Sequence, residues 1–160
     1  MFSMTLICMG KLKEKFYSSA AEEYKKRLGA FCDFQLIELP ELRLPEGPNE
    51  TQIAQGLSRE AELIRAKIPK GSFFCVLAPE GKMLSSEELA EKLSELKRGG
   101  RSSVCFLIGS SFGVDAGLKK QADLLLSMSR MTFPHHLARV MALEQLYRAE
   151  AIQAGTKYHK

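Results

Sequence analysis

Residues 73–108 read FFCVLAPEGKMLSSEELAEKLSELKRGGRSSVCFLI, and this stretch decides the fold. It begins and ends with apolar runs of strand length, 73–78 and 104–108, which lack the alternation of a half-exposed strand. Between them, Ser85 and Glu88 have the spacing of a capping box, which predicts a helix over 85–98 that ends at Gly99 and Gly100. Two strands joined through a helix form a crossover unit, so these strands are expected to be parallel.

The same pattern continues on both sides of this unit. Apolar runs at 4–9, 34–39 and 124–128 predict three more strands. Further helices are predicted over 13–28, from about 49, over about 115–122 and over about 133–154. The loop LPELRLPEGP at 39–48 contains three prolines and one glycine, which oppose regular structure. The sequence therefore predicts one α/β domain over 1–160, with a mainly parallel sheet and helices on both faces.

Composition and charge indicate a globular chain with a basic end. The hydrophobic fraction is 45%, the charged fraction 26% and the net charge +4. From position 130 onward, five Lys or Arg residues stand against two Glu residues. Such an end suits a polyanion such as nucleic acid, although an ordinary solvated surface explains the charge equally well.

The beginning of the chain predicts a strand rather than a signal peptide. The first apolar run has no basic region before it and no small-residue cleavage site after it. No later run approaches membrane-spanning length, so we expect a cytoplasmic protein without a membrane partner.

The four cysteines, Cys8, Cys32, Cys75 and Cys105, are far apart in the sequence. Their spacing matches neither a metal site nor a redox motif, and three of them lie within apolar runs. We expect small buried thiols in a reducing compartment, and no metal cofactor.

The loops after the third, fourth and fifth predicted strands are the candidates for a binding site, because ligands of such sheets bind beyond the carboxyl ends of the strands. Gly109 and Gly113 bracket two serines after the fourth strand, and glycine lets a backbone approach a ligand closely. Their spacing is not a dinucleotide fingerprint. After the fifth strand, SMSRMTFPHH at 127–136 combines backbone polar groups with apolar side chains, which suits a flat heteroaromatic ring such as adenine. A core role for these apolar residues is equally consistent with composition.

The last predicted helix carries a wide apolar stripe that includes Val140, Leu143 and Leu146. The stripe is too wide for one contact, so it is expected to pack against the sheet and also against a second subunit.

Several motifs together resemble a known family. MTFPHHLARVMALEQLYRAEAIQAGTKYHK at the end, MGKLKEK near the start, GKMLSSEELA in the middle and FLIGSSFGVD after them are similar to the RlmH branch of the SPOUT methyltransferases. The resemblance covers essentially the whole chain. It implies an α/β-knot fold with a C-terminal trefoil knot, a homodimer, and methylation of N3 of a pseudouridine in 23S ribosomal RNA by S-adenosyl-L-methionine. A non-enzymatic RNA-binding or ribosome-associated factor on the same fold is the alternative.

The resemblance also assigns roles to residues. The cofactor site it implies consists of Leu77, Gly109, Met128, Ser129, Arg130, Met131, Thr132 and Phe133. In the implied reaction His159 accepts the N3 proton, Tyr158 orients His159, and Arg139 or Lys160 stabilises the developing anion. The chain departs from the family at Ser110, where a second glycine is common, and at His136, where another residue often stands.

Overall fold

The computed structural model describes residues 1–160, which form one five-stranded parallel sheet with the strand order β2-β1-β4-β3-β5. The strands are β1 (Ser3–Met9), β2 (Asp33–Leu39), β3 (Phe73–Met83), β4 (Ser103–Ile108) and β5 (Leu124–Ser127). The helices are α1 (Lys15–Leu28), α2 (Glu50–Arg65), α3 (Ser86–Arg98), α4 (Ala116–Gln121) and α5 (His135–Gln153). The predicted fold class, a parallel α/β sheet, is confirmed.

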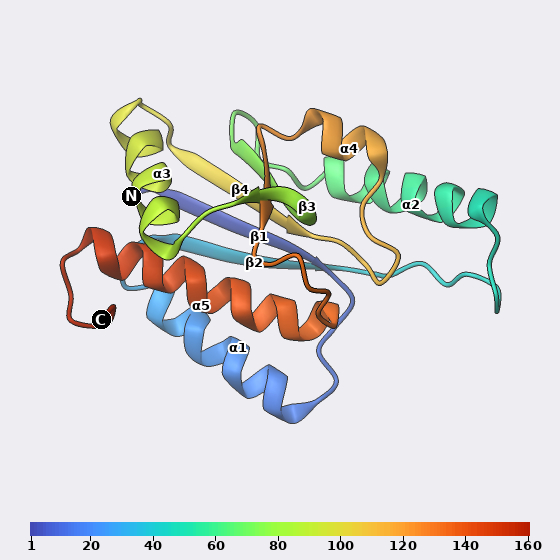
Figure 1. The fold of residues 1–160 in the computed structure, drawn as a ribbon, viewed down its shortest axis with the longest axis horizontal. Coiled ribbons are helices and arrows are strands. Elements are labelled where there is room, and N and C mark those ends of the chain that lie inside the picture. The colour runs from blue at the N-terminus through green and yellow to red at the C-terminus, as the bar shows by residue number, and fades with distance from the viewer.

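Helices cover both faces of the sheet. In Figure 1, α2 and α4 lie above the strands, and α1 and α5 lie below them. One core cluster joins α1, α3 and α5 to one face through residues such as Leu6, Leu93 and Leu143. The other joins α2 and α4 to the opposite face through Ile64, Leu107 and Leu118. Because both faces of β1 and β4 are buried, these strands need no polar alternation, which explains their continuous apolar runs.

The predicted helix starts are confirmed in α2 and α3. Asn49 and Ser85 are the N-caps, and each accepts a hydrogen bond from the backbone of the residue three positions on, Gln52 or Glu88. The side chain of that residue bonds back to the N-cap backbone, so both capping boxes are complete. Helix α5 begins two residues later than expected, with Pro134 as its N-cap.

Strand β3 is longer than predicted. The sequence predicts a strand over 73–78, followed by Pro79 and Gly81, which are typical of turns. After an irregularity, however, the strand pairs with β5 again, so that both Leu77 and Lys82 align with Leu126. A Cβ at Gly81 would lie 2.6 Å from the carbonyl carbon of Leu125, so only glycine fits this close passage. Strand β3 thus passes close to β5 on both sides of the irregularity. The trefoil knot itself stays a prediction.

All four cysteines are buried and unpaired, as predicted. Burial raises the pKa of each thiol to about 12, so all four remain protonated at neutral pH. None of the five helices combines the length and the apolar character that crossing a membrane requires. The structure holds no group of three His, Cys, Asp or Glu side chains arranged to bind a metal ion.

Candidate active site

The carboxyl ends of β4, β3 and β5 lie side by side, because these parallel strands are neighbours in the sheet. The segments that follow them enclose a cavity of about 580 Å³, which we call the strand-end cavity. Seven of the eight predicted cofactor residues line it: Leu77, Gly109, Met128, Ser129, Met131, Thr132 and Phe133. The eighth, Arg130, is exposed and does not line it. The structure therefore brings the three predicted loops together around one hollow.

Gly109 is required by the packing of its own loop. A Cβ at this position would collide with the carbonyl oxygen of Gly113 and would lie 2.6 Å from Cγ2 of Val114. Gly113 has a φ of +95°, a left-handed conformation that disfavours other residues. The sequence suggested that glycine here lets the backbone approach a ligand. The structure adds a different reason, because any side chain at Gly109 would displace the loop itself.

A buried carboxylate that no sequence motif indicated supports the same loop from α2. Glu60 is 5% exposed, accepts a hydrogen bond from Oγ of Ser110 at 2.9 Å and accepts another from the backbone N–H of Leu42 at 3.2 Å. Burial raises the pKa of Glu60. The signal was present in the sequence, since Gly56, Glu60 and Ile64 stand at four-residue spacing on the buried side of α2.

A second acidic residue lies between the loop and the start of α5. Oε1 of Glu41 accepts hydrogen bonds from the backbone N–H and the hydroxyl of Ser111, at 3.2 and 2.9 Å. Its Oε2 lies 3.6 Å from Nε2 of His135, a cavity-lining residue whose Nε2 is buried without a hydrogen-bond partner. Burial, together with the neighbouring His136, lowers the pKa of His135. The cavity wall therefore presents a neutral imidazole at physiological pH.

The loop after β5 offers main-chain polar groups to the cavity. The hydroxyl of Ser127 donates to the carbonyl of Ser129 at 2.9 Å, and Oγ of Ser129 accepts from the N–H of Met131 at 3.0 Å. These two bonds fix the loop. The main-chain groups of Thr132 and Phe133 make no hydrogen bond within the chain, so they are free to bind a ligand.

The terminal residues Tyr158 and His159 are held against α3 and α5. Nε2 of His159 lies 2.6 Å from Oε1 of Glu87, and its Nδ1 lies 3.1 Å from Nη1 of Arg148. The hydroxyl of Tyr158 donates to Oε1 of Glu144 at 3.0 Å, and the guanidinium of Arg148 lies 4.8 Å from the centre of its ring. Burial and the bond to Glu144 raise the pKa of Tyr158 to about 12, so its hydroxyl stays protonated.

Within one chain, Arg139 lies apart from Tyr158 and His159. Its side chain is 1% exposed, and its guanidinium donates to Oε2 of Glu38 at 2.6 Å and to the carbonyls of Gly10 and Met9 at 2.8 and 3.2 Å. These partners lie at the ends of β1 and β2. Nine residues of helix separate Arg139 from Arg148, roughly 14 Å along the axis. This position favours a structural role, holding α5 on the sheet, over the predicted role at the reacting base.

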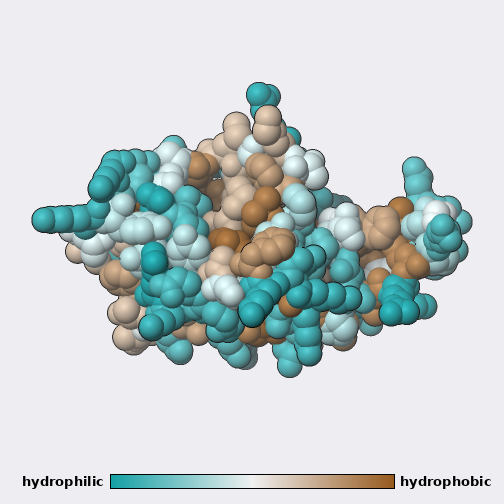
Figure 2. Space-filling view, turned by 90° about the horizontal axis from the view of Figure 1, so that it is seen from below, coloured by the Kyte–Doolittle hydropathy of each residue, from teal (hydrophilic) through white to brown (hydrophobic).

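The apolar stripe of α5 divides between core and surface. Leu143 is fully buried within the chain, whereas Val140 and Met141 are partly exposed. Val140 and Met141 border a hollow of about 370 Å³ beside Tyr24 of α1. Figure 2, seen from the side on which α1 and α5 lie, shows apolar side chains near the centre of a mainly hydrophilic face. Of the predicted stripe residues Val140, Leu143 and Leu146, only Val140 is exposed enough to contact a second subunit.

Comparison with known proteins gives full-length matches in sequence. A family model described as "Predicted SPOUT methyltransferase" matches residues 2–159. The "Ribosomal RNA large subunit methyltransferase H" of Streptococcus suis is 43% identical over 155 residues, which are 97% of this chain and 98% of that protein. The protein of the same name from Bifidobacterium adolescentis is 45% identical over 157 residues, 98% of this chain and 99% of the relative.

Solved structures with lower identity share the fold. A probable methylase family protein from Haemophilus influenzae matches with a TM-score of 0.55 at 17% identity, covering 99% of this chain and 70% of the other. A putative methylase family protein from Neisseria gonorrhoeae matches with a TM-score of 0.57 at 12% identity, covering 91% and 82%. The match of the family model over nearly the whole sequence, supported by these relatives, shows that this chain belongs to the SPOUT methyltransferase family.

Proposed function

We propose that this protein methylates N3 of a pseudouridine in the 23S RNA of the large ribosomal subunit, with S-adenosyl-L-methionine as the methyl donor. The observation that carries the proposal is the strand-end cavity, which gathers the three loops that the motifs assigned to the cofactor. Two full-length relatives named as large-subunit ribosomal RNA methyltransferases support the substrate class. The net charge of +4 suits an RNA partner.

The residues of the cavity fit this cofactor. The free main-chain groups of Thr132 and Phe133 match the donor and acceptor pattern at the edge of an adenine ring, and Leu77 and Met131 supply apolar surface for its faces. When bound, the cofactor supplies a methyl group attached to a positively charged sulfur. The neutral His135 in the cavity wall would add no second positive charge to a cavity that holds this cofactor.

The terminal residues of the chain fit the proton transfer that the reaction needs. N3 of the base has to lose its proton as it accepts the methyl group, and an imidazole is suited to take it. The carboxylate of Glu87 accepts from Nε2–H of His159, which leaves the lone pair on Nδ1. That lone pair faces Arg148, so the guanidinium has to give way to the base. Tyr158, protonated and bonded to Glu144, acts as the support that orients the tail.

The assembly we propose is a homodimer through the exposed side of α5. Val140 and Met141 give this side an apolar character that a second copy of the chain would cover. A dimer also doubles the positive charge that meets the RNA. Since ribosomal RNA is the substrate, we expect the protein to act in the cytoplasm.

Two measurements test the proposed function. Calorimetry with S-adenosyl-L-methionine should give binding in the micromolar range. Mass mapping of ribosomal RNA from cells with and without the gene should show the loss of one methyl group from a pseudouridine of 23S RNA. RNA binding by a folded protein that binds no cofactor and leaves the methylation pattern unchanged would instead indicate the non-enzymatic RNA-binding factor.

A further inference from the structure

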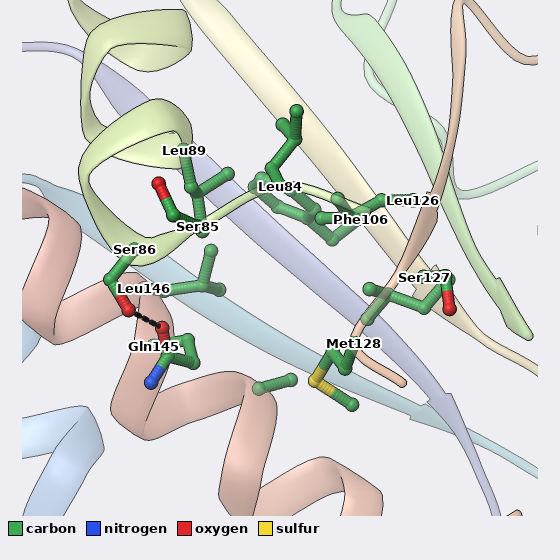
Figure 3. Close-up of a pocket in the computed structure, with 12 residues that line it drawn as sticks. Leu84, Ser85, Ser86, Leu89, Phe106, Leu126, Ser127, Met128, Gln145 and Leu146 are labelled. Atoms are coloured by element: carbon green, nitrogen blue, oxygen red, sulfur yellow. Dashed lines mark hydrogen bonds between the residues drawn. The ribbon is translucent and has the colours of Figure 1, made fainter. Parts of the chain in front are cut away.

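A second cavity adjoins the strand-end cavity and lies between it and the C-terminal tail. Its volume is about 290 Å³, and it shares Leu77, Leu126 and Met128 with its larger neighbour. Most of its remaining wall is apolar and comes from Leu84, Leu89, Phe106, Ala142 and Leu146. Figure 3 shows Ser86 and Gln145 on one side of this cavity, and Ser127 and Met128 on the other. The cavity thus has apolar walls and a polar edge on α3 and α5.

Hydrogen bonds hold the amide of Gln145 in one orientation at that edge. Its Oε1 accepts from the hydroxyl of Ser86 at 2.6 Å (Figure 3), and its Nε2 donates to Oε2 of Glu144 at 2.8 Å. An amide oxygen can accept two hydrogen bonds and an amide nitrogen can donate two. One acceptor position and one donor position of Gln145 therefore remain for a ligand on the same planar group.

The same hydrogen bonds connect the cavity to the tail. Glu144 accepts from Gln145 through Oε2 and from the hydroxyl of Tyr158 through Oε1. At the same edge of the cavity, Ser86 is followed by Glu87, which holds His159. A ring in this cavity would therefore have the cofactor cavity on one side and the proposed proton acceptor on the other.

We propose that the second cavity binds the pyrimidine ring of the target nucleotide and that Gln145 recognises the ring as pseudouridine. The inference rests on the proposed function. The apolar walls suit the faces of an extruded base, and the polar edge suits its hydrogen-bonding groups. Pseudouridine carries an N1–H beside its C2 carbonyl, whereas N1 of uridine is bonded to the ribose and has no hydrogen. The Gln145 amide accepts from N1–H and donates to O2, which leaves N3 free to react.

The test compares Gln145→Leu, which removes the amide at similar volume, with Gln153→Leu on the same helix. The amide of Gln153 bonds to Lys97 and to the carbonyl of Ala149, away from both cavities. Each variant is assayed on large-subunit ribosomal RNA, free and in ribosomes, with either pseudouridine or uridine at the target position. Calorimetry with S-adenosyl-L-methionine and thermal unfolding report cofactor binding and folding.

We expect Gln145→Leu to lose roughly tenfold in kcat/KM on the pseudouridine substrate, as for one or two neutral hydrogen bonds. Its preference for pseudouridine over uridine should fall by about the same factor, while cofactor affinity stays unchanged. Gln153→Leu should behave like the wild type. Leu84→Trp, which fills the second cavity without touching the strand-end cavity, should lose methyl transfer on both substrates and still bind the cofactor.

Three results would overturn the inference. If Gln145→Leu keeps the wild-type preference for pseudouridine, then Gln145 does not recognise this base. If Leu84→Trp keeps full activity, then no base enters the second cavity. Loss of cofactor affinity in folded variants would assign the second cavity to the cofactor instead. These results do not contradict the proposed function. A wild-type protein that binds the cofactor but methylates neither RNA would contradict both the proposed function and this inference.

Discussion

Substitution of Arg139 tests whether this residue stabilises the fold or takes part in the reaction. Replacing it by methionine removes three hydrogen bonds from the junction of α5 with β1 and β2. Removing one partner of a buried ion pair costs about 3–5 kcal/mol. Because Glu38 is 33% exposed and can be hydrated, we expect the lower end of that range. In a domain of this size a loss of ~3 kcal/mol lowers Tm by roughly 6–12 °C.

The assay is thermal and urea unfolding, with cofactor calorimetry and methyl transfer measured below the melting transition. Arg65→Met is the matched control, because the Arg65 side chain is 41% exposed and its loss should change the free energy of unfolding by less than about 0.5 kcal/mol. If Arg139→Met melts like this control and binds cofactor normally yet loses methyl transfer more than about a hundredfold, the structural assignment is wrong. Arg139 would then act on the reacting base, as the sequence predicted.

Four further predictions follow from the site and the helix interface. His159→Ala should lower turnover at least ~100-fold, as for a positioned base, with cofactor affinity retained. Full turnover of this variant would show that His159 has no role in the reaction. In sedimentation experiments Val140→Asp should give a folded monomer, whereas Leu143→Asp should unfold the chain because Leu143 is fully buried; a stable dimer of Val140→Asp would contradict the interface. Because the pKa of Glu60 is raised, folded protein binds its proton more tightly, so stability should fall as pH rises from the ordinary value of 4.5 through the raised value. Glu60→Gln should flatten that slope in urea titrations, and an unchanged slope would rule out Glu60 as its source. Gly109→Leu should weaken cofactor binding and also lower Tm, since its side chain meets the loop itself; an unchanged Tm would show that the loop can yield.

Local patterns were sufficient to predict the elements whose signals lie within a few residues. The capping box at Ser85 predicted the start of α3, and the helix expected from about position 49 also begins with a capping box, which Gln52 closes from three positions away. The extension of β3 was not predictable in this way. It depends on pairing between Lys82 and Leu126, which are distant in sequence, and the proline and glycine before Lys82 are ordinary turn signals.

In the candidate site, too, sequence patterns predicted some features, whereas others depend on contacts between residues that are distant in sequence. The three loops could be found because each follows an apolar strand, and parallel strands end at one edge of a sheet. The contacts of Arg139 could not be predicted, since an arginine on a helix gives the same sequence signal whether it faces RNA or, as here, the carbonyls of Met9 and Gly10. Arg130 stands within the same motif as the cavity-lining residues, but its side chain is exposed and lies outside the cavity, which the sequence pattern did not indicate.

The order of strands in the sheet has a consequence for how the chain folds during synthesis. Strand β1 is an interior strand between β2 and β4, and Ser3 pairs with Ser103 of β4. One edge of β1 therefore remains unpaired until about two thirds of the chain has been synthesised. Helix α5 arrives last and connects to β1 and β2 through contacts more than a hundred residues apart in sequence. Such long-range pairing slows folding, so nascent chains that stop before β4 should be sensitive to proteases and prone to aggregate through that exposed edge.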